Sequence, residues 1–163
     1  MNRENLFRAK GKNSFGQYIW YYGSYYSYRD INYCFDNELS EEERKNNIKD
    51  VIIYVSTGDW NMKNHLEVAE IDHKTLGMFV GRDKNNKPIY TGDIVKTYYE
   101  NGDEFIEEIV YKNNQFLAKM MFEDIEMFSP LPKTVCIDPE RVKMVSLEVI
   151  GNKFDNKELL EDK

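Results

Sequence analysis

Short apolar runs separated by polar turns dominate the second half of the chain. An apolar run over 76–80 leads into the polar turn 81–87, and a second run begins at Pro88. The next three apolar segments cover 94–99, 105–111 and 115–121. Asn-Gly and Asn-Asn pairs stand at the reversals between these segments, as in β-hairpins. The pattern therefore predicts a hairpin followed by a meander of short antiparallel strands, which is typical of a small barrel.

The first half combines two strand patterns with one helix signal. A short strand is predicted over 6–10 and a buried strand over 51–55, each followed by turn-forming residues. Between them, Ser40 and Glu43 have the spacing of a capping box, in which each residue bonds the backbone amide of the other. We therefore expect a short helix over 41–49, with acids in its first turn and bases later.

The last part of the chain begins with a connector that carries prolines. These are Pro130, Pro132 and Pro139. A final strand is predicted over 142–150, because this segment is apolar and rich in valine. Asp155 and Glu158 have the spacing that opens a terminal helical turn.

Composition favours strands over helices throughout. The 163 residues include 23 aromatic side chains and many β-branched ones, but only three alanines and nine leucines. A chain of this length buries about 70% of the surface of its unfolded form, enough for one core or two small ones. We predict a mainly β protein: an aromatic-rich N-terminal sheet region with a short helix over 1–68, and a small antiparallel SH3-like barrel over 69–163.

Ten aromatic residues lie between Phe15 and Phe35. This segment is either a stacking platform for bases or sugars, a protein interface, or a hairpin whose aromatics alternate between core and rim. Arg29 is the only cation in it, which favours a protein interface over a nucleic-acid groove. The candidate interface residues are Tyr21, Tyr22, Tyr25, Tyr26 and Tyr28. Because sheet edges also need covering, we expect the protein to self-associate.

The charge balance argues against general binding to nucleic acid. The chain has 22 basic and 29 acidic residues, a formal net charge of −7, whereas proteins that track phosphates present a basic face. One local exception is the hairpin tip with Arg82, Lys84 and Lys87, which Lys96 on the next strand could approach. This tip is either an anion or nucleic-acid contact or a solvated turn that Asp83 partly neutralises.

Residues suited to catalysis or metal binding do not have matching spacings. Cys34 and Cys136 are far apart, and His65 and His73 are eight residues apart, so neither pair fits a zinc site or a nucleophile with its base. Both cysteines have apolar neighbours, as structural cysteines do. The chain also lacks a glycine-rich phosphate loop. We therefore predict no catalytic residues, no metal site and no cofactor.

The sequence contains no segment that resembles a membrane span or a secretion signal. A span needs about 18 consecutive apolar residues, and no window reaches this length. We expect a cytoplasmic protein that does not bind membranes.

Three blocks of sequence resemble a known family. Residues 75–95 read TLGMFVGRDKNNKPIYTGDIV, Phe7-Arg8-Ala9 lies near the start, and LEVIGN at 147–152 lies near the end. These blocks are similar to the YopX family, small proteins encoded by bacteriophages and prophages of Gram-positive bacteria. Asn86 stands where the family turn often has glycine, and Thr91 where it often has glutamate.

The resemblance implies a mostly β fold and no established activity, so there are no functional residues to transfer. We interpret Asp93, in the block Gly-Asp-Ile-Val, as a turn-forming residue rather than a general acid. We expect a non-enzymatic phage or prophage accessory protein that binds another protein. The alternative is a nucleic-acid-binding module that uses the basic tip at 82–87.

Overall fold

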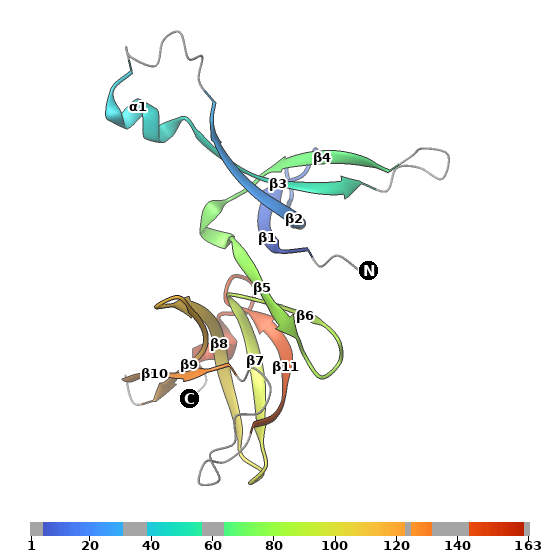
Figure 1. Cartoon of the computed structure of the whole chain (residues 1–163), viewed down its shortest axis with the longest axis vertical. Helices are drawn as coiled ribbons and strands as arrows, with labels where there is room; N and C mark the ends of the chain where they lie inside the picture. The colour runs from blue at the N-terminus through green and yellow to red at the C-terminus, as the bar shows by residue number, and fades with distance from the viewer. Residues whose placement is uncertain (1–4, 31–38, 57–63, 123–124, 132–143, 162–163) are drawn as a thin grey trace. The chain divides into compact units, whose positions relative to one another are not determined.

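The computed structural model describes residues 5–30, 39–56, 64–122, 125–131 and 144–161. The chain divides into two compact units, an N-terminal unit over 1–77 and a C-terminal unit over 78–163 (Figure 1). Strands make up most of both units, which confirms the prediction of a mainly β protein.

The N-terminal unit is built on an antiparallel sheet with the strand order β4-β3-β2-β1. Its elements are β1 (Phe7–Lys12), β2 (Tyr18–Arg29), α1 (Glu41–Asn46), β3 (Ile48–Ser56), β4 (His65–Glu70) and the short 3-10 helix η2 (His73–Thr75). A bridge between Gly11 and Ile71 also brings the end of β1 to the residue that follows β4. The bridge therefore places the core residue Ile71 next to β1.

Residues 18–29 of the aromatic-rich segment form one continuous strand and not a hairpin of their own. The first half of β2 pairs with β1, and its second half pairs with β3. Gly23 lies where the pairing changes sides, and a Cβ on this residue would lie 2.2 Å from the carbonyl oxygen of Ile53. Glycine therefore allows the strand to continue through this position, because it lets the two backbones approach closely.

The core of the N-terminal unit lies on one face of this sheet. Ala9, Ile52 and Ile71 are buried in it, and aromatic side chains of β1, β2 and β3 pack around them. Tyr21 and Tyr25 are among these aromatic residues.

The capping box of α1 is confirmed, but the helix is shorter than predicted. The Glu43 amide donates to Ser40 Oγ at 3.2 Å, and the Ser40 amide donates to Glu43 Oε2 at 2.9 Å. The helix ends at Asn46 and not at Lys49, because β3 begins at Ile48, which is the register partner of Arg29 in β2. Sheet pairing therefore takes over the last residues of the predicted helix.

The C-terminal unit contains a five-stranded antiparallel sheet with the order β10-β9-β8-β7-β11 and the hairpin of β5 and β6. Its elements are β5 (Gly77–Arg82), β6 (Pro88–Tyr90), β7 (Asp93–Tyr99), β8 (Glu104–Lys112), β9 (Gln115–Phe122), β10 (Ile125–Pro130), β11 (Met144–Asn152) and α2 (Glu158–Glu161). The predicted hairpin and meander are therefore present. Strand β10 was not predicted and occupies the first part of the proline-bearing connector; Pro132 and Pro139 lie outside the described residues.

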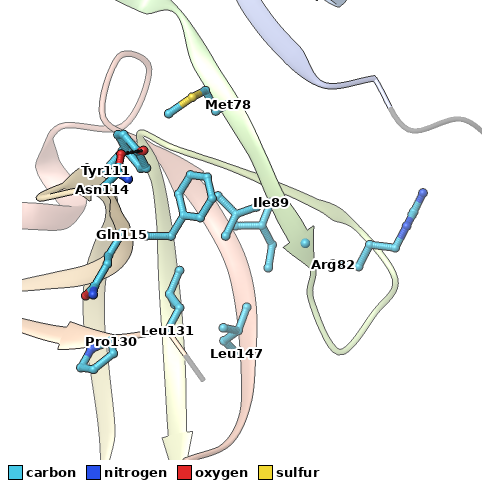
Figure 2. Close-up of a pocket in the computed structure, with 12 residues that line it drawn as sticks. Met78, Arg82, Ile89, Tyr111, Asn114, Gln115, Pro130, Leu131 and Leu147 are labelled. Carbon is cyan, nitrogen blue, oxygen red and sulfur yellow. Dashed lines mark hydrogen bonds between the residues drawn. The ribbon is translucent and has the colours of Figure 1, made fainter. Parts of the chain in front are cut away.

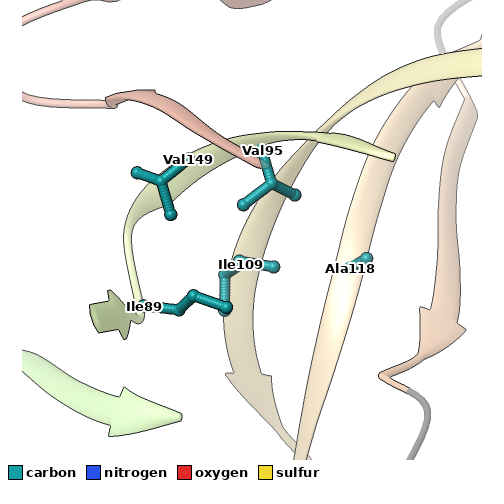
Figure 3. Close-up of a cluster of buried hydrophobic side chains, with 5 residues drawn as sticks. All are labelled: Ile89, Val95, Ile109, Ala118 and Val149. Carbon is teal, nitrogen blue, oxygen red and sulfur yellow. The ribbon is translucent and has the colours of Figure 1, made fainter. Parts of the chain in front are cut away.

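Five buried side chains form the core of the C-terminal unit (Figure 3). They are Ile89, Val95, Ile109, Ala118 and Val149. Ile89 comes from the hairpin and the other four from the sheet, so the hairpin and the sheet share one core.

The division between the units lies later in the chain than we expected. The predicted boundary between 68 and 69 falls inside β4, and Ala69 pairs with Ile52 at the centre of the N-terminal sheet. Because β4 completes that sheet, the N-terminal unit extends to Gly77.

Candidate functional site

The outward face of β2 carries a row of exposed tyrosines. Successive side chains of a strand point to opposite faces, so the even-numbered residues of β2 share one face. Tyr22, Tyr26 and Tyr28 are 41%, 57% and 41% exposed. The rings of Tyr26 and Tyr28 are nearly parallel, with centroids 6.2 Å apart. Three of the five candidate interface tyrosines are therefore available to a partner.

The other two candidate tyrosines, Tyr21 and Tyr25, pack against the core of the N-terminal unit. Tyr21 contacts the ring of Tyr54, with centroids 5.3 Å apart. The Tyr25 hydroxyl donates to Asp50 Oδ1 at 2.6 Å. Burial, together with this hydrogen bond, raises the pKa of Tyr25. Both residues have odd numbers on β2 and therefore face the buried side.

Strands β3 and β4 extend the exposed face with apolar side chains. Val55 and Leu66 are opposite each other in the register, and Val68 is opposite Ile53. Val55, Leu66 and Val68 are 59%, 71% and 62% exposed. We call this surface the outer tyrosine face. It consists of Tyr22, Tyr26, Tyr28, Val55, Leu66 and Val68.

A salt bridge lies on the same side of the sheet as these residues. Lys49 is opposite Tyr28 in the register and Glu70 is opposite Val51, so both share the outward side of the sheet. Their side chains are 2.8 Å apart, and this contact raises the pKa of Lys49. An apolar centre with charged neighbours is the arrangement that protein interfaces have.

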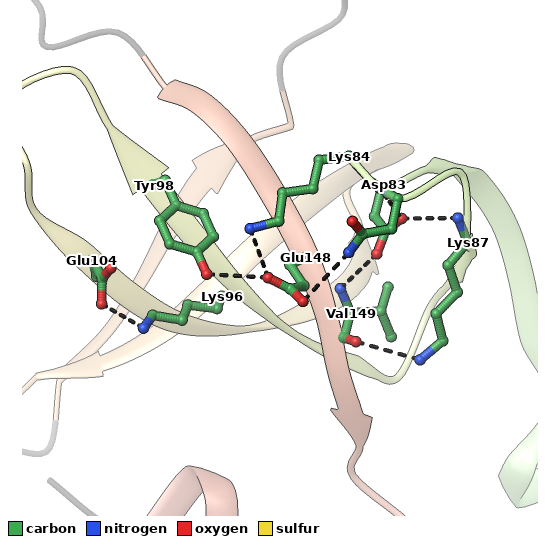
Figure 4. Close-up of polar contacts among 9 residues, drawn as sticks. Asp83, Lys84, Lys87, Lys96, Tyr98, Glu104, Glu148 and Val149 are labelled. Atoms are coloured by element: carbon green, nitrogen blue, oxygen red, sulfur yellow. Dashed lines mark hydrogen bonds and ion pairs between the residues drawn. The ribbon is translucent and has the colours of Figure 1, made fainter.

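The cationic side chains of the basic hairpin tip make contacts within the protein (Figure 4). Lys84 Nζ lies 2.7 Å from Glu148 Oε2, which raises the pKa of Lys84 and lowers that of Glu148. Lys87 Nζ donates to the carbonyl oxygen of Val149 at 3.3 Å, and Arg82 donates to the carbonyl oxygen of Asn86 at 2.5 Å.

Lys96 does approach this region, as expected from the strand order. Lys84 and Lys96 both lie over the ring of Tyr98, at 4.0 and 5.4 Å from its centroid, and Lys96 also pairs with Glu104. The tip cations thus have acidic or carbonyl partners inside the C-terminal unit. A phosphate would have to compete with these partners for each cation.

Asp83 holds the backbone of this hairpin tip in place through hydrogen bonds to backbone amides. Its Oδ1 accepts hydrogen bonds from the amides of Asn85 and Lys87 at 2.9 and 2.8 Å, and its Oδ2 accepts one from the amide of Val149 at 3.0 Å. Desolvation raises the pKa of this carboxyl, but the three backbone donors outweigh it and hold the pKa below its usual value. Asp83 therefore ties the hairpin turn to β11.

The backbone conformation of Asn86 accounts for one departure of this turn from the family pattern, which often has glycine at this position. Its φ is +65°, a left-handed conformation that glycine adopts without strain and asparagine tolerates. We expect Asn86→Gly to change the free energy of unfolding by less than about 0.5 kcal/mol, and Asn86→Val to lower it by about 1–2 kcal/mol. Urea denaturation followed by circular dichroism measures both. Equal stability of the two variants would contradict the role of the backbone conformation.

Asp93 is a turn-forming residue, as its sequence context predicted. It is 1% exposed, and its Oδ2 accepts a hydrogen bond from the amide of Tyr90 at 2.8 Å. Gly92 before it has a φ of +85°, so a residue with a side chain would be strained there. Gly92 and Asp93, in the sequence block 75–95, therefore have a structural role in this turn.

The two histidines make separate polar contacts with different acidic residues. His65 contacts Glu67 at 2.9 Å, and His73 lies 3.5 Å from Asp50. Tyr54 donates to Glu67 at 2.5 Å, which raises the pKa of Tyr54 to about 12. Among the described residues there is no group of three His, Cys, Asp or Glu that could hold a metal ion. Cys34 and Cys136 lie outside those residues.

The paired glutamates of β8 do not converge. Glu107 is buried and accepts a hydrogen bond from the hydroxyl of Thr97 at 2.5 Å, whereas Glu108 pairs with Lys153 at 3.0 Å. As neighbours on one strand, they lie on opposite faces. They therefore cannot act together on one substrate.

A cavity of about 620 Å³ opens in the C-terminal unit (Figure 2). Its lining is largely apolar and includes Met78, Val80, Ile89, Phe116, Leu131 and Leu147. The sequence did not predict this cavity, because its lining residues come from six strands, β5, β6, β8, β9, β10 and β11, and from the residues Asn114 and Leu131 that follow β8 and β10.

The geometry defines a two-unit antiparallel β protein with an exposed aromatic and aliphatic sheet face. The family model for the YopX protein matches residues 7–161, nearly the whole chain, so the protein belongs to the YopX family. Searches of curated proteins and of solved structures find no match to the chain. In the part of the chain that the structure describes, the helices are too short and too polar to cross a membrane.

Proposed function

We propose that this protein is a non-enzymatic, self-associating β module that binds another protein through the outer tyrosine face. The observation that carries the proposal is the exposure of six large apolar or aromatic side chains on three neighbouring strands. Contiguous apolar patches on a soluble protein mark interaction sites. Tyrosines supply rigid contact area with a polar tip, which suits a protein partner.

The contacts of the titratable groups support a binding role over catalysis. His65, His73, Glu107 and Glu108 each have a partner within their own unit, and they do not form one site. The proposal therefore includes no catalytic residue, metal or cofactor.

Pull-down from the lysate of induced host cells tests the proposal. Immobilised wild-type protein is expected to retain a partner protein that a Tyr26→Asp variant releases, because the substitution places a charge in the middle of the face. Equal retention by both proteins would contradict a role for this face.

The family and the fold support three finer proposals. The resemblance to the YopX family implies a phage or prophage origin, so we propose a phage or prophage accessory protein that acts in the cytoplasm of a bacterial host. We also propose that the C-terminal unit forms a small SH3-like barrel. The core that the β5–β6 hairpin shares with the five-stranded sheet supports this closure.

Nucleic-acid binding by the basic tip is the alternative function, and the contacts of the tip argue against it. Arg82, Lys84 and Lys87 are held by partners within the unit, and the chain has a net charge of −7. In fluorescence anisotropy titrations at physiological salt, we expect DNA to bind more weakly than about 1 mM. Sub-micromolar, salt-sensitive binding that is lost in the Arg82→Ala, Lys84→Ala, Lys87→Ala triple variant would reverse this ranking.

A further inference from the structure

Phe15 is presented at the tip of a well-ordered turn between β1 and β2. Its side chain is 85% exposed, more than any other large apolar side chain among the described residues. Asn13 holds the turn: its Oδ1 accepts hydrogen bonds from the amides of Phe15 and Gln17 at 3.0 and 2.9 Å, and its carbonyl oxygen accepts one from Gly16. Because the backbone is fixed by these bonds, the ring can be buried in a partner without ordering the loop first.

The cavity of the C-terminal unit has the properties that such a ring requires. Its volume of about 620 Å³ is within the range of ligand pockets, and apolar side chains such as Phe116 and Leu131 line it (Figure 2). Gly81 also lines the cavity, and a Cβ built on it meets no atom within 4 Å. The cavity therefore has room for an aromatic anchor.

The charges of the two regions are complementary. Residues 5–29, which include the Phe15 turn and both its strands, contain four basic residues and no acidic residue. Residues 78–163 contain 17 acidic and 12 basic residues. The turn region is therefore basic and the C-terminal unit is acidic as a whole, and this difference favours contacts between the turn of one copy and the C-terminal unit of another over contacts between like regions.

We propose that the Phe15 turn of one copy inserts its phenyl ring into the cavity of the C-terminal unit of a second copy. This inference rests on the self-association in the proposed function, but it uses residues outside the outer tyrosine face. The contact is heterologous, because the turn and the cavity are different surfaces. Each copy then offers one turn and one cavity, so copies join into chains or closed rings.

Light scattering with two complementary variants tests this contact. Wild-type protein at micromolar concentration is expected to have a mass above the 19.4 kDa of one chain, rising with concentration. Phe15→Ser removes the anchor and Gly81→Phe fills the cavity, so each variant should associate at least about tenfold more weakly. An equal mixture of the two variants should form a dimer and nothing larger, because one intact turn meets one intact cavity.

Controls separate this contact from other forms of association. Leu6→Ser changes another apolar side chain of the N-terminal unit, 58% exposed, and should leave the wild-type mass unchanged. Circular dichroism of Gly81→Phe checks its fold, and Phe15→Ser tests the contact without altering the cavity. A wild-type mass of 19.4 kDa at all concentrations, or a mixture that stays monomeric, would overturn the inference. If Tyr26→Asp alone lowers the mass, the inference fails while the proposed function stands.

Discussion

Replacement of Asp83 by alanine is expected to destabilise the C-terminal unit by about 3 kcal/mol or more. The side chain is 8% exposed and accepts three backbone hydrogen bonds from two segments distant in sequence. Hydrogen bonds to a charged group contribute about 1.5–3 kcal/mol, and removal of the acceptor leaves buried amides without partners. The midpoint of urea denaturation, followed by circular dichroism, measures the loss.

Two further variants show whether the effect comes from these bonds. Asp83→Asn keeps one side-chain oxygen as an acceptor but loses the charge, so its stability should lie between wild type and Asp83→Ala. Asp103→Ala, in an exposed turn of the same unit, should change stability by less than about 0.5 kcal/mol. Similar losses for Asp83→Ala and Asp103→Ala would contradict the role of Asp83.

The same carboxyl gives stability a pH dependence of definite sign. The pKa of Asp83 is lower in the folded protein than the ordinary pKa of an aspartate side chain. A depressed pKa stabilises the fold at pH values above the unfolded pKa, and this contribution is lost as the pH falls through the folded pKa. We therefore expect wild type to lose stability more steeply than Asp83→Asn as the pH falls below about 4.

Most strands were predicted from local sequence patterns. The elements that were missed or misplaced depend on pairing between strands distant in sequence. The meander from 94 to 121 was predictable because each reversal carries turn-forming residues next to apolar runs. Strand β4 was missed, although Leu66 and Val68 alternate with charged residues, because the segment is short and polar on one side. The end of α1 was misplaced because the pairing of Ile48 with Arg29 cannot be read from neighbouring residues.

The segment that carries the candidate interface could be predicted from the sequence. Which of its side chains share one surface could not. Once β2 is a continuous strand, residue numbers alone assign Tyr22 and Tyr26 to one face and Tyr25 to the other. The sequence also allowed a hairpin in this segment, and a reversal within it would change which tyrosines share a face. The contributions of β3 and β4 to the face depend on register, which a single sequence does not specify.

Cations beside the aromatic residues were also missed. Arg8 and Lys10 of β1 lie 4.6 and 5.3 Å from the ring of Trp20, and Lys12 lies 5.5 Å from that of Tyr18. The sequence places these cations outside the aromatic segment, so only the pairing of β1 with β2 brings them together.

The outer tyrosine face should lose its partner when two charges are placed on it. Tyr26 and Leu66 lie on β2 and β4, and both side chains are more than half exposed. Replacement of both by aspartate should leave the fold intact, because neither side chain belongs to the core. Each aspartate would become a buried, unpaired charge in a complex, so we expect binding to fall by at least about a hundredfold.

Capture of a partner from the lysate of induced host cells tests the central claim most directly. The experiment compares the proteins retained by three immobilised baits. The baits are wild type, the Tyr26→Asp, Leu66→Asp double variant, and Ile125→Asp, whose side chain in the other unit is 63% exposed. The predicted result is the same partner on wild type and Ile125→Asp and its absence from the double variant. Equal capture by all three baits, or no partner on wild type, would contradict a protein-binding role for the outer tyrosine face.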